Sequence, residues 1–244
     1  MSYKVNLKNE FNEEGLSKEK IKKLREFEDI VAINSMKFDW DKNIAIMNNY
    51  FNLGGLGFDS VVYINESDQY MKLSFLGKYI DMETEESDEQ VNPITNGTIN
   101  KITEKWYEIL SEKDVVSGEK IVLSTEDGEV KARKYIIRVN NEQLRSFLNY
   151  VLETIERDNN FMNYIESIYQ YDGMGQITGK NLAKSIRKAV NEASDMNFTY
   201  ESYIDMDGYI VEENIGISFN LDLAESGSLK RQEIQIETKK WNIE

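Results

Sequence analysis

Residues 209–223 read Tyr-Ile-Val-Glu-Glu-Asn-Ile-Gly-Ile-Ser-Phe-Asn-Leu-Asp-Leu, and this stretch indicates the fold more strongly than any other. Apolar residues fall mainly on odd positions and polar residues on even ones, a period of two that predicts a β-strand with one covered and one wet face. Strands in globular sheets usually have about 3 to 10 residues. A strand of this length therefore predicts strong coiling or a bulge near Gly216.

The same stretch completes one of two similar hairpins. Val61–Leu73 and Glu201–Val211 each pass from a strand ending in Tyr-Ile-Asn or Tyr-Ile-Asp, through a short polar turn, into a strand that opens with Tyr. A further hairpin between Ile121 and Val139 is indicated by Asp127-Gly128, a pair that favours a type I′ turn. Paired hairpins with long amphipathic strands predict a curved antiparallel sheet.

Helical periodicity appears before and between these hairpins. An N-terminal helical segment is predicted for residues 1–35, where Ser17 can act as the N-cap. A second helix is predicted to begin near Thr98, and Asn140 or Asn141 caps the clearest helix, which two shorter helices follow. The apolar residues at helical spacing in the N-terminal segment and in the clearest helix are Ile21, Leu24, Phe27, Val31, Leu144, Phe147, Leu148, Val151, Leu152 and Ile155.

The elements follow the order helix, strands, helix, strands, helices, strands, with hairpins in place of alternating crossover units. That order predicts a single α+β domain over residues 1–244. The similarity of the hairpins Val61–Leu73 and Glu201–Val211 also permits an internal pseudo-repeat of residues 36–115 and 120–244.

Composition limits the chemistry that is open to the chain. Its 44 acidic and 29 basic residues give a formal net charge of −15, so we expect neither nucleic acid nor an anionic membrane as a direct partner. It has no His and no Cys, which removes imidazole acid–base groups, thiolate nucleophiles and the usual zinc ligands. A metal would have to be a hard ion held by oxygen, and we expect neither a metal nor a cofactor.

Three polar motifs favour turns and loops over binding sites. Gly54–Gly57 lacks the Gly-Lys-Ser/Thr ending of a phosphate loop, so it predicts a turn. Asp205–Gly208 would place Tyr203 and Asn214 where a calcium loop requires Asp and Glu, so it also predicts a turn. The acidic segment Asp81–Gln90 predicts a solvated loop, with a site for a cation or a basic partner as the alternative.

No arrangement of catalytic residues stands out. Glu212 and Glu213 are adjacent on a strand and point to opposite faces. Asp81 and Glu83 share a face but lie at the edge of the acidic segment. Ser17-Lys18-Glu19-Lys20 has the spacing of a Ser-x-x-Lys nucleophile and base, yet it is typical of a capped first turn of a helix. We therefore expect no catalytic residues.

Membrane insertion is not indicated. No run approaches the roughly 18 apolar residues of a membrane-spanning helix, and the N-terminus lacks the charged and then apolar pattern of a signal peptide. We expect a soluble chain, and whether its sequence starts after a removed signal stays open.

Three segments, Tyr63-Ile64-Asn65, Tyr70–Ile80 and Tyr203–Ile210, resemble the extracytoplasmic lipoproteins of Gram-positive bacteria, whose sheets form half-barrels similar to LolA-like and LppX-like envelope proteins. The resemblance covers most of the chain as a pattern of strands and turns, without a catalytic motif. It implies a strongly curved antiparallel sheet, helices packed on its concave face, and an apolar cavity between them that holds a lipid in some members. The chain departs from this pattern because it has no signal and no lipid-attachment Cys.

Candidate ligand-binding residues follow from that cavity. The residues predicted to line it are Phe75, Trp106, Phe147, Val151, Phe161, Ile165, Ile217, Phe219 and Leu221. The structural alternative is that these side chains fill an ordinary core. Tyr169–Gln176 is predicted to form a mobile rim, because it combines glycines with aromatic residues.

We therefore expect a non-enzymatic, envelope-associated bacterial protein that binds a lipid or another hydrophobic small molecule. It would be extracytoplasmic and associated with the cell surface if the sequence starts after a removed signal, and cytoplasmic otherwise. The alternative is a surface interaction or structural module with a filled core and an acidic face, and a cytosolic enzyme relying on carboxylates is a third reading. The sequence does not fix the oligomeric state.

Overall fold

The structure is a computed structural model that describes residues 1–65, 68–82, 93–125, 128–171, 179–221 and 227–240. The strands are β1 (Ser2–Phe11), β2 (Asp29–Asp39), β3 (Ile44–Leu53), β4 (Leu56–Ile64), β5 (Gln69–Leu73), β6 (Tyr79–Asp81), β7 (Val115–Thr125), β8 (Gly128–Val139), β9 (Ala193–Asp205), β10 (Ile210–Leu221) and β11 (Leu229–Lys239). The helices are α1 (Lys18–Arg25), α2 (Asn96–Ile109), the short 3-10 helix η1 (Glu112–Asp114), α3 (Asn141–Glu156), α4 (Asn159–Tyr171) and α5 (Gly179–Glu192).

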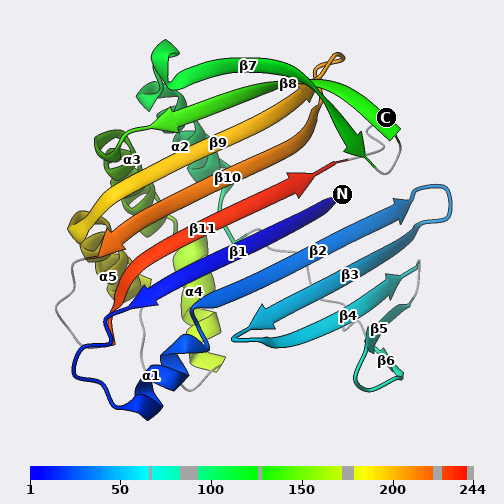
Figure 1. Cartoon of the computed structure of the whole chain (residues 1–244), viewed down its shortest axis with the longest axis horizontal. Helices are drawn as coiled ribbons and strands as arrows, with labels where there is room; N and C mark the ends of the chain where they lie inside the picture. The colour runs from blue at the N-terminus through cyan, green and yellow to red at the C-terminus, as the bar shows by residue number, and fades with distance from the viewer. Residues whose placement is uncertain (66–67, 83–92, 126–127, 172–178, 222–226, 241–244) are drawn as a thin grey trace.

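All the described strands belong to one antiparallel sheet (Figure 1), in the order β6-β5-β4-β3-β2-β1-β11-β10-β9-β8-β7. The sheet consists of two meanders, β1 to β6 and β7 to β11, which are joined where the first strand pairs with the last. We call β2 to β6 the N-terminal arm and β7 to β11 the C-terminal arm. Since β6 and β7 lie at opposite edges, the sheet stays open instead of closing into a barrel. The predicted α+β class with an antiparallel sheet is confirmed.

The prediction of a helical segment over residues 1–35 is wrong for most of that range. Only Lys18–Arg25 is helical, with Ser17 accepting a hydrogen bond from the Lys20 amide as its N-cap. Ser2–Phe11 is a strand because it pairs on both sides, with β11 and with β2. Tertiary pairing between the two ends of the chain therefore overrides the local helical spacing, and Val31 belongs to β2.

The predicted hairpins are confirmed. β4 pairs with β5, β7 with β8, and β9 with β10. In the β9–β10 turn the Asp205 carboxylate accepts hydrogen bonds from the Asp207 and Tyr209 amides, at 3.0 and 2.8 Å. This carboxylate therefore stabilises a turn. The long strand β10 is irregular on both sides of the position we predicted, between Ile210 and Glu212 and between Ser218 and Asn220.

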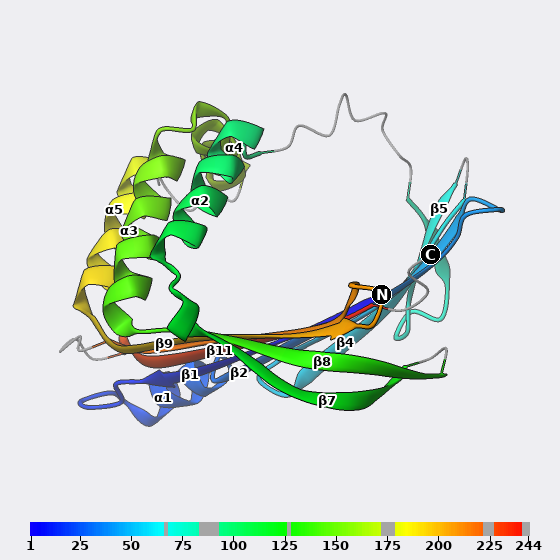
Figure 2. The same cartoon turned by 90° about the horizontal axis from the view of Figure 1, so that it is seen from above.

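The helices α2 to α5 gather on one side of the sheet and at one end of its strands. Figure 2 shows α2, α3 and α5 rising from the sheet with one end on it, and α4 at the far end of this helix cluster. α3 packs against β9, α2 and α5 pack against α3, and α4 packs against α3 and α5. α1 lies apart from this cluster, in the connection that leads from the end of β1 to the start of β2 (Figure 1).

The hydrophobic core lies at the foot of the helix cluster, where α3 meets the C-terminal arm. Its buried residues are Val139, Leu144, Ala193, Met196 and Leu221. Trp106 of α2 packs edge-on against Phe147 and Phe198, with ring centroids 5.0 and 5.1 Å apart. Such aromatic pairs add about 0.5–1.5 kcal/mol beyond their buried area. The core thus fastens the helix cluster to β8, β9 and β10.

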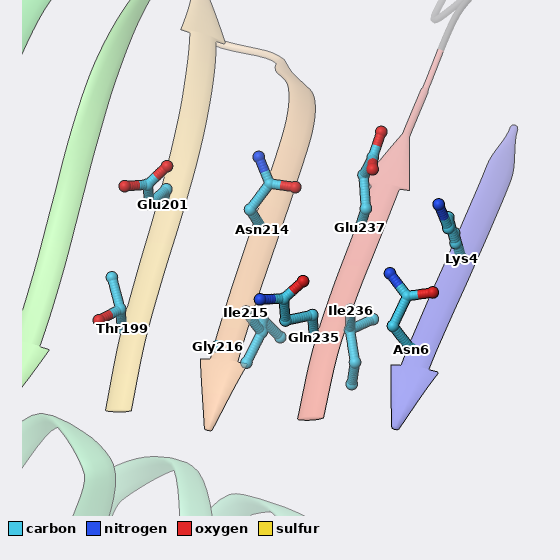
Figure 3. A pocket seen from close by; sticks show the side chains of 10 residues that line it. All are labelled: Lys4, Asn6, Thr199, Glu201, Asn214, Ile215, Gly216, Gln235, Ile236 and Glu237. Carbon is cyan, nitrogen blue, oxygen red and sulfur yellow. The ribbon is translucent and has the colours of Figure 1, made fainter. Parts of the chain in front are cut away.

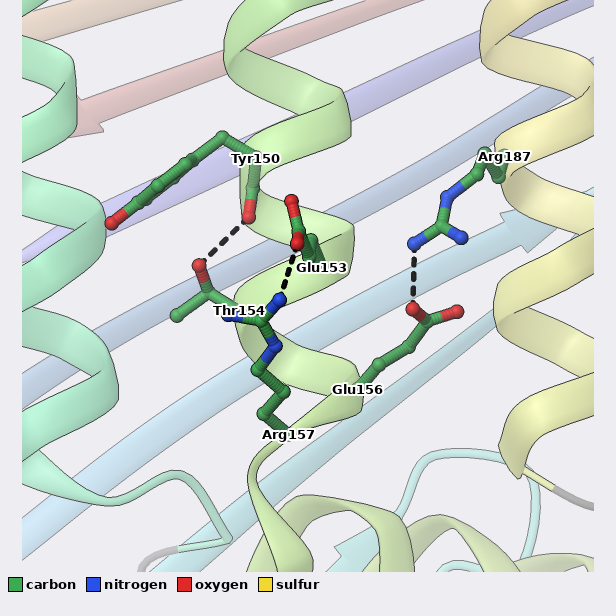
Figure 4. A network of polar contacts seen from close by, with 6 residues as sticks. All are labelled: Tyr150, Glu153, Thr154, Glu156, Arg157 and Arg187. Atoms are coloured by element: carbon green, nitrogen blue, oxygen red, sulfur yellow. Dashed lines mark hydrogen bonds and ion pairs between the residues drawn. The ribbon is translucent and has the colours of Figure 1, made fainter.

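Polar contacts fix the helices to one another. Of the two predicted cap residues of α3, Asn140 is the N-cap, and it forms a capping box with Gln143. Figure 4 shows the ion pair between Arg187 of α5 and Glu156 of α3, with 2.6 Å between Nη2 and Oε2. Arg145 of α3 donates to the carbonyls of Val190, Asn191 and Ala193, and so caps the C-terminal end of α5. The cluster therefore behaves as one packed unit.

Candidate functional site

The strand register divides the side chains of the sheet into two faces. Phe198, Phe219 and Leu221 belong to the helical core or pack against it, so the even residues of β9 after Met196 and the odd residues of β10 point toward the helices. Directly opposed residues of an antiparallel pair share a face, and the strand pairings extend this assignment across the sheet. We call this face the helix-facing side and the other the outer face.

Two apolar rows cross the helix-facing side from β8 to β4. The first is Val139, Phe198, Ile217, Ile234, Leu7, Ile30, Leu53 and Leu56. The second is Ile137, Tyr200, Ile215, Ile236, Val5, Ala32, Phe51 and Phe58. Both rows continue well beyond the strands that carry the helical core.

These rows keep solvent access where the helices no longer cover them. The central aliphatic residues are only half-buried, in contrast to Leu144 and Leu221 at the foot of the helices. On the N-terminal arm Phe51 is 42% exposed, Phe58 50% and Leu56 69%. Within the described part of the chain, the helix-facing side is therefore a largely apolar surface that the helices cover at one end only.

A polar row runs beside the two apolar rows, on the side away from the core. Its members are Tyr135, Ser202, Glu213, Thr238, Tyr3, Asn34, Asn49 and Ser60. Asn34 donates to Asn49, and Asn49 donates to the Ser60 hydroxyl at 3.3 Å. Beyond this row the N-terminal arm is apolar again, with Met36, Met47, Val62 and Met71 in register.

Glu213 is the one ionisable carboxylate of the polar row. Its Oε1 accepts the Tyr200 hydroxyl at 2.6 Å and its Oε2 accepts Lys240 Nζ at 2.9 Å. Burial would raise the pKa of Glu213, but these two hydrogen bonds outweigh it and hold the pKa below its ordinary value. Burial and the adjacent carboxylate raise the pKa of Tyr200 to about 12. Glu213 is therefore charged and Tyr200 neutral at physiological pH.

The structure separates the predicted cavity residues into groups. Leu221 is buried in the core, Trp106 and Phe219 pack against that core, and Phe147 packs edge-on against Trp106. Ile217 lies in the first apolar row. Val151, Phe161 and Ile165 are half-buried residues of α3 and α4.

Phe75 lies apart from the other predicted residues. It follows β5, six strands away from β10 in the sheet, and is 69% exposed. Sequence reasoning predicted only Ile217 of the two apolar rows and missed their members on the other strands, including Val5, Leu7 and Ala32 of β1 and β2. The alternation of Tyr3, Val5 and Leu7 was the available signal.

Two of the hollows formed by the described residues are lined mainly from the outer face. Figure 3 shows the first, of about 260 Å³, whose side chains come from β1, β9, β10 and β11. Gly216 contributes to its depth, because a Cβ added there would meet no atom within 4 Å. The second hollow, of about 280 Å³, lies where the end of β7 approaches β1, β2, β10 and the end of β11, and its lining includes Lys240, which directly follows β11. Both are lined mainly by polar side chains, unlike the helix-facing side.

Other predicted sites find little support or fall outside the described residues. The acidic residues 83–90 and the rim residues 172–176 lie outside the part that the structure describes. Within that part, no group of three or more acidic side chains could hold a metal ion. The described helices also include none with the length and apolar character needed to cross a membrane.

Comparison with known proteins leaves this site without a precedent by sequence. Neither a family model nor a curated protein matches the chain.

Proposed function

We propose that the chain is a non-enzymatic, envelope-associated bacterial protein that binds a lipid or another hydrophobic molecule on the helix-facing side of its sheet. In this proposal the sheet is a half-barrel, the helices pack on its concave face, and the ligand lies beside them. The supporting observation is that two apolar rows span eight strands while the helical core covers only one end of them. The protein would act outside the cytoplasmic membrane, as the lipoprotein resemblance suggests.

The physical argument rests on the free energy of exposed apolar surface. Burial of apolar area contributes about 25 cal/mol per Å², so a ligand with an acyl chain would gain from covering Ile215, Ile236 and Val5. These side chains are half-buried by their neighbours in the sheet and still accessible. An apolar surface with a few polar groups at its border is typical of small-molecule sites.

A non-catalytic role agrees with the state of the carboxylates. Glu213 is held by Tyr200 and Lys240, and Glu201 on the outer face pairs with Lys134 at 2.8 Å. With no His or Cys in the chain, a proton-transfer site would depend on carboxylates, Lys or Tyr, and Glu213 is already engaged by one Tyr and one Lys.

Native mass spectrometry after mild purification tests this proposal. We expect lipid-sized adducts that denaturing conditions remove. Ile236→Asn places a polar group in the second apolar row and should reduce the adduct fraction severalfold. The control is Gln235→Asn on the outer face, next to Ile236 in the chain, which should leave the adducts unchanged.

The opposite result would be bare protein from every preparation, together with no thermal shift on adding fatty acids or phospholipids. That result would favour the alternative, a surface interaction or structural module with an acidic face.

A further inference from the structure

The charged pair on the helix-facing side lies at the border of the apolar rows. Glu213 is directly opposed by Ser202 and Thr238, and the neighbouring position along β10 on the same face is Ile215. The Glu213 side chain is 22% exposed and the Lys240 side chain 33% exposed. The pair is thus partly shielded but still open to a ligand.

The pair has unused hydrogen-bonding capacity. An ionised carboxylate offers about four lone-pair sites, and among the described residues Glu213 uses two of them, for Tyr200 and Lys240. The Lys240 ammonium has three donors, of which one goes to Glu213. Both groups can therefore bind a further partner without breaking their contact.

We propose that Glu213 and Lys240 form a subsite for the head group of a zwitterionic amphiphile, with its ammonium on Glu213 and its phosphate on Lys240. The acyl chains would lie across the two apolar rows, toward the foot of the helices. This inference rests on the proposed function and adds to it the class of ligand.

Charge balance favours a zwitterion over a singly charged head group. The charges of Glu213 and Lys240 cancel locally, while the chain as a whole carries −15, so an anionic head group would meet a repulsive field. A cationic head group on Glu213 would bring its charge close to the Lys240 ammonium, with no negative group of its own to offset the repulsion. A head group with both charges complements both partners, through charge-assisted hydrogen bonds.

A purely structural role makes a different prediction. The Lys240 amide also donates to the Val211 carbonyl at 2.8 Å, so the pair could serve only to fasten the end of β11 to β10. In that case its removal would lower the stability of the fold without changing which lipid binds. Head-group selectivity therefore distinguishes the two roles.

The experiment is a competition among three lipids with identical acyl chains: phosphatidylethanolamine, which is zwitterionic, phosphatidylglycerol, which is anionic, and diacylglycerol, which is uncharged. The full chain is incubated with mixed vesicles that contain the three lipids in equal molar amounts, and the bound lipids are counted by native mass spectrometry. The wild-type protein should take up phosphatidylethanolamine preferentially. Glu213→Gln and Lys240→Gln should each reduce this preference about tenfold, since each removes one charge-assisted contact.

Matched controls come from the neighbouring residues on the outer face. Glu212→Gln and Lys239→Gln make the same charge changes one residue away, on side chains that point to the other side of the sheet, and should keep the wild-type preference. If a Glu213 or Lys240 variant fails to fold, the preference of the wild-type protein between phosphatidylethanolamine and uncharged diacylglycerol still decides, because the net negative charge of the chain does not repel diacylglycerol.

Two results would overturn the inference in distinguishable ways. The first is equal uptake of the three lipids by the wild-type protein, or an unchanged preference in folded Glu213→Gln and Lys240→Gln. Either would show that the pair does not recognise the head group, although the protein still binds lipid. Uptake of no lipid at all would overturn the proposed function and this inference with it.

Discussion

The C-terminal arm and the N-terminal arm belong to one sheet but are stabilised differently. On the C-terminal arm, Val139, Met196 and Leu221 are buried against helices. On the N-terminal arm, the buried apolar residues are two small ones, Ala45 and Val62, while aromatic residues are exposed on both faces. These exposed aromatic residues are Phe38, Tyr50, Phe51, Phe58, Tyr63 and Tyr79.

Backbone pairing between strands, more than packing of a core, therefore stabilises the N-terminal arm. β3 contains no charged residue, although 30% of the residues of the chain are charged. Depletion of charge together with aromatic enrichment is typical of surfaces that are covered in a complex. Local stability varies across a structure with the density of buried contacts, so we expect the two arms to respond unequally to the same perturbation.

The largest effect should come from truncating the core. Leu144→Ala at the foot of α3, where Leu144 is 4% exposed, should lower the free energy of unfolding by about 3 kcal/mol. Leu53→Ala in the first apolar row of the N-terminal arm should cost less than about 1.5 kcal/mol, because Leu53 is only half-buried. Urea unfolding of both variants measures the two losses in free energy of unfolding. Equal losses would show that packing stabilises the two arms to the same extent.

The second effect concerns the far end of the helix cluster. Asp158 is 5% exposed and accepts hydrogen bonds from the amide and hydroxyl of Thr95 and from the amides of Asn160 and Phe161. Asp158→Ala should cost about 1–2 kcal/mol near neutral pH, the usual cost of losing a helix cap. The control is Asp207→Ala, at an exposed position. An equal loss in free energy of unfolding in this variant would show that the hydrogen bonds of Asp158 contribute nothing specific.

The stabilisation by Asp158 should depend on pH. Hydrogen bonds, first of all from Thr98, hold the pKa of Asp158 well below its ordinary value. A carboxylate with a lowered folded pKa stabilises the fold above its unfolded pKa of about 4 and loses this contribution as the pH falls further. The difference between wild type and Asp158→Ala should therefore be constant from neutral pH down to about pH 5 and shrink in stronger acid. Thermal unfolding across this range measures it.

The third effect concerns the turn that joins β3 to β4, where two glycines can be replaced by alanine. Gly54 has a φ of 58°, and a Cβ there would lie 2.6 Å from the backbone of Glu26. Gly55 also has a positive φ but would meet nothing within 4 Å. Gly54→Ala should therefore lower the thermal midpoint more than Gly55→Ala, for which strain of about 1 kcal/mol is the main cost. Equal midpoints would mean that α1 does not restrain the N-terminal arm at this turn.

The smallest effect should come from the surface of the N-terminal arm. Phe58→Thr removes an aromatic side chain that is 50% exposed and should change the free energy of unfolding by no more than about 0.5 kcal/mol. Calorimetry checks this value. A loss comparable to that of Leu144→Ala would show that a covering partner or a self-association had stabilised the arm.

Local signals predicted part of this fold well. The Asp205 turn, the Asn140 cap and the alternation of β10 depend on residues close in sequence, and each is found where the sequence indicates it. β1 was missed because its pairing partners lie at the other end of the chain and beyond α1. Phe75 was placed with Ile217 and Phe219 because a shared apolar character does not reveal a separation of six strands.

The sequence by itself determined which residues share a face of each strand, because side chains alternate with a period of two. It also determined the polar or apolar character of each face and the absence of His and Cys chemistry. Only the tertiary structure decided that eight strands align their residues into two apolar rows and one polar row. That alignment depends on register, which turns and bulges set and which a slip of one residue would reverse. Glu213 could therefore be read from the sequence as an isolated acid, but its place beside Tyr200 and Lys240 could not.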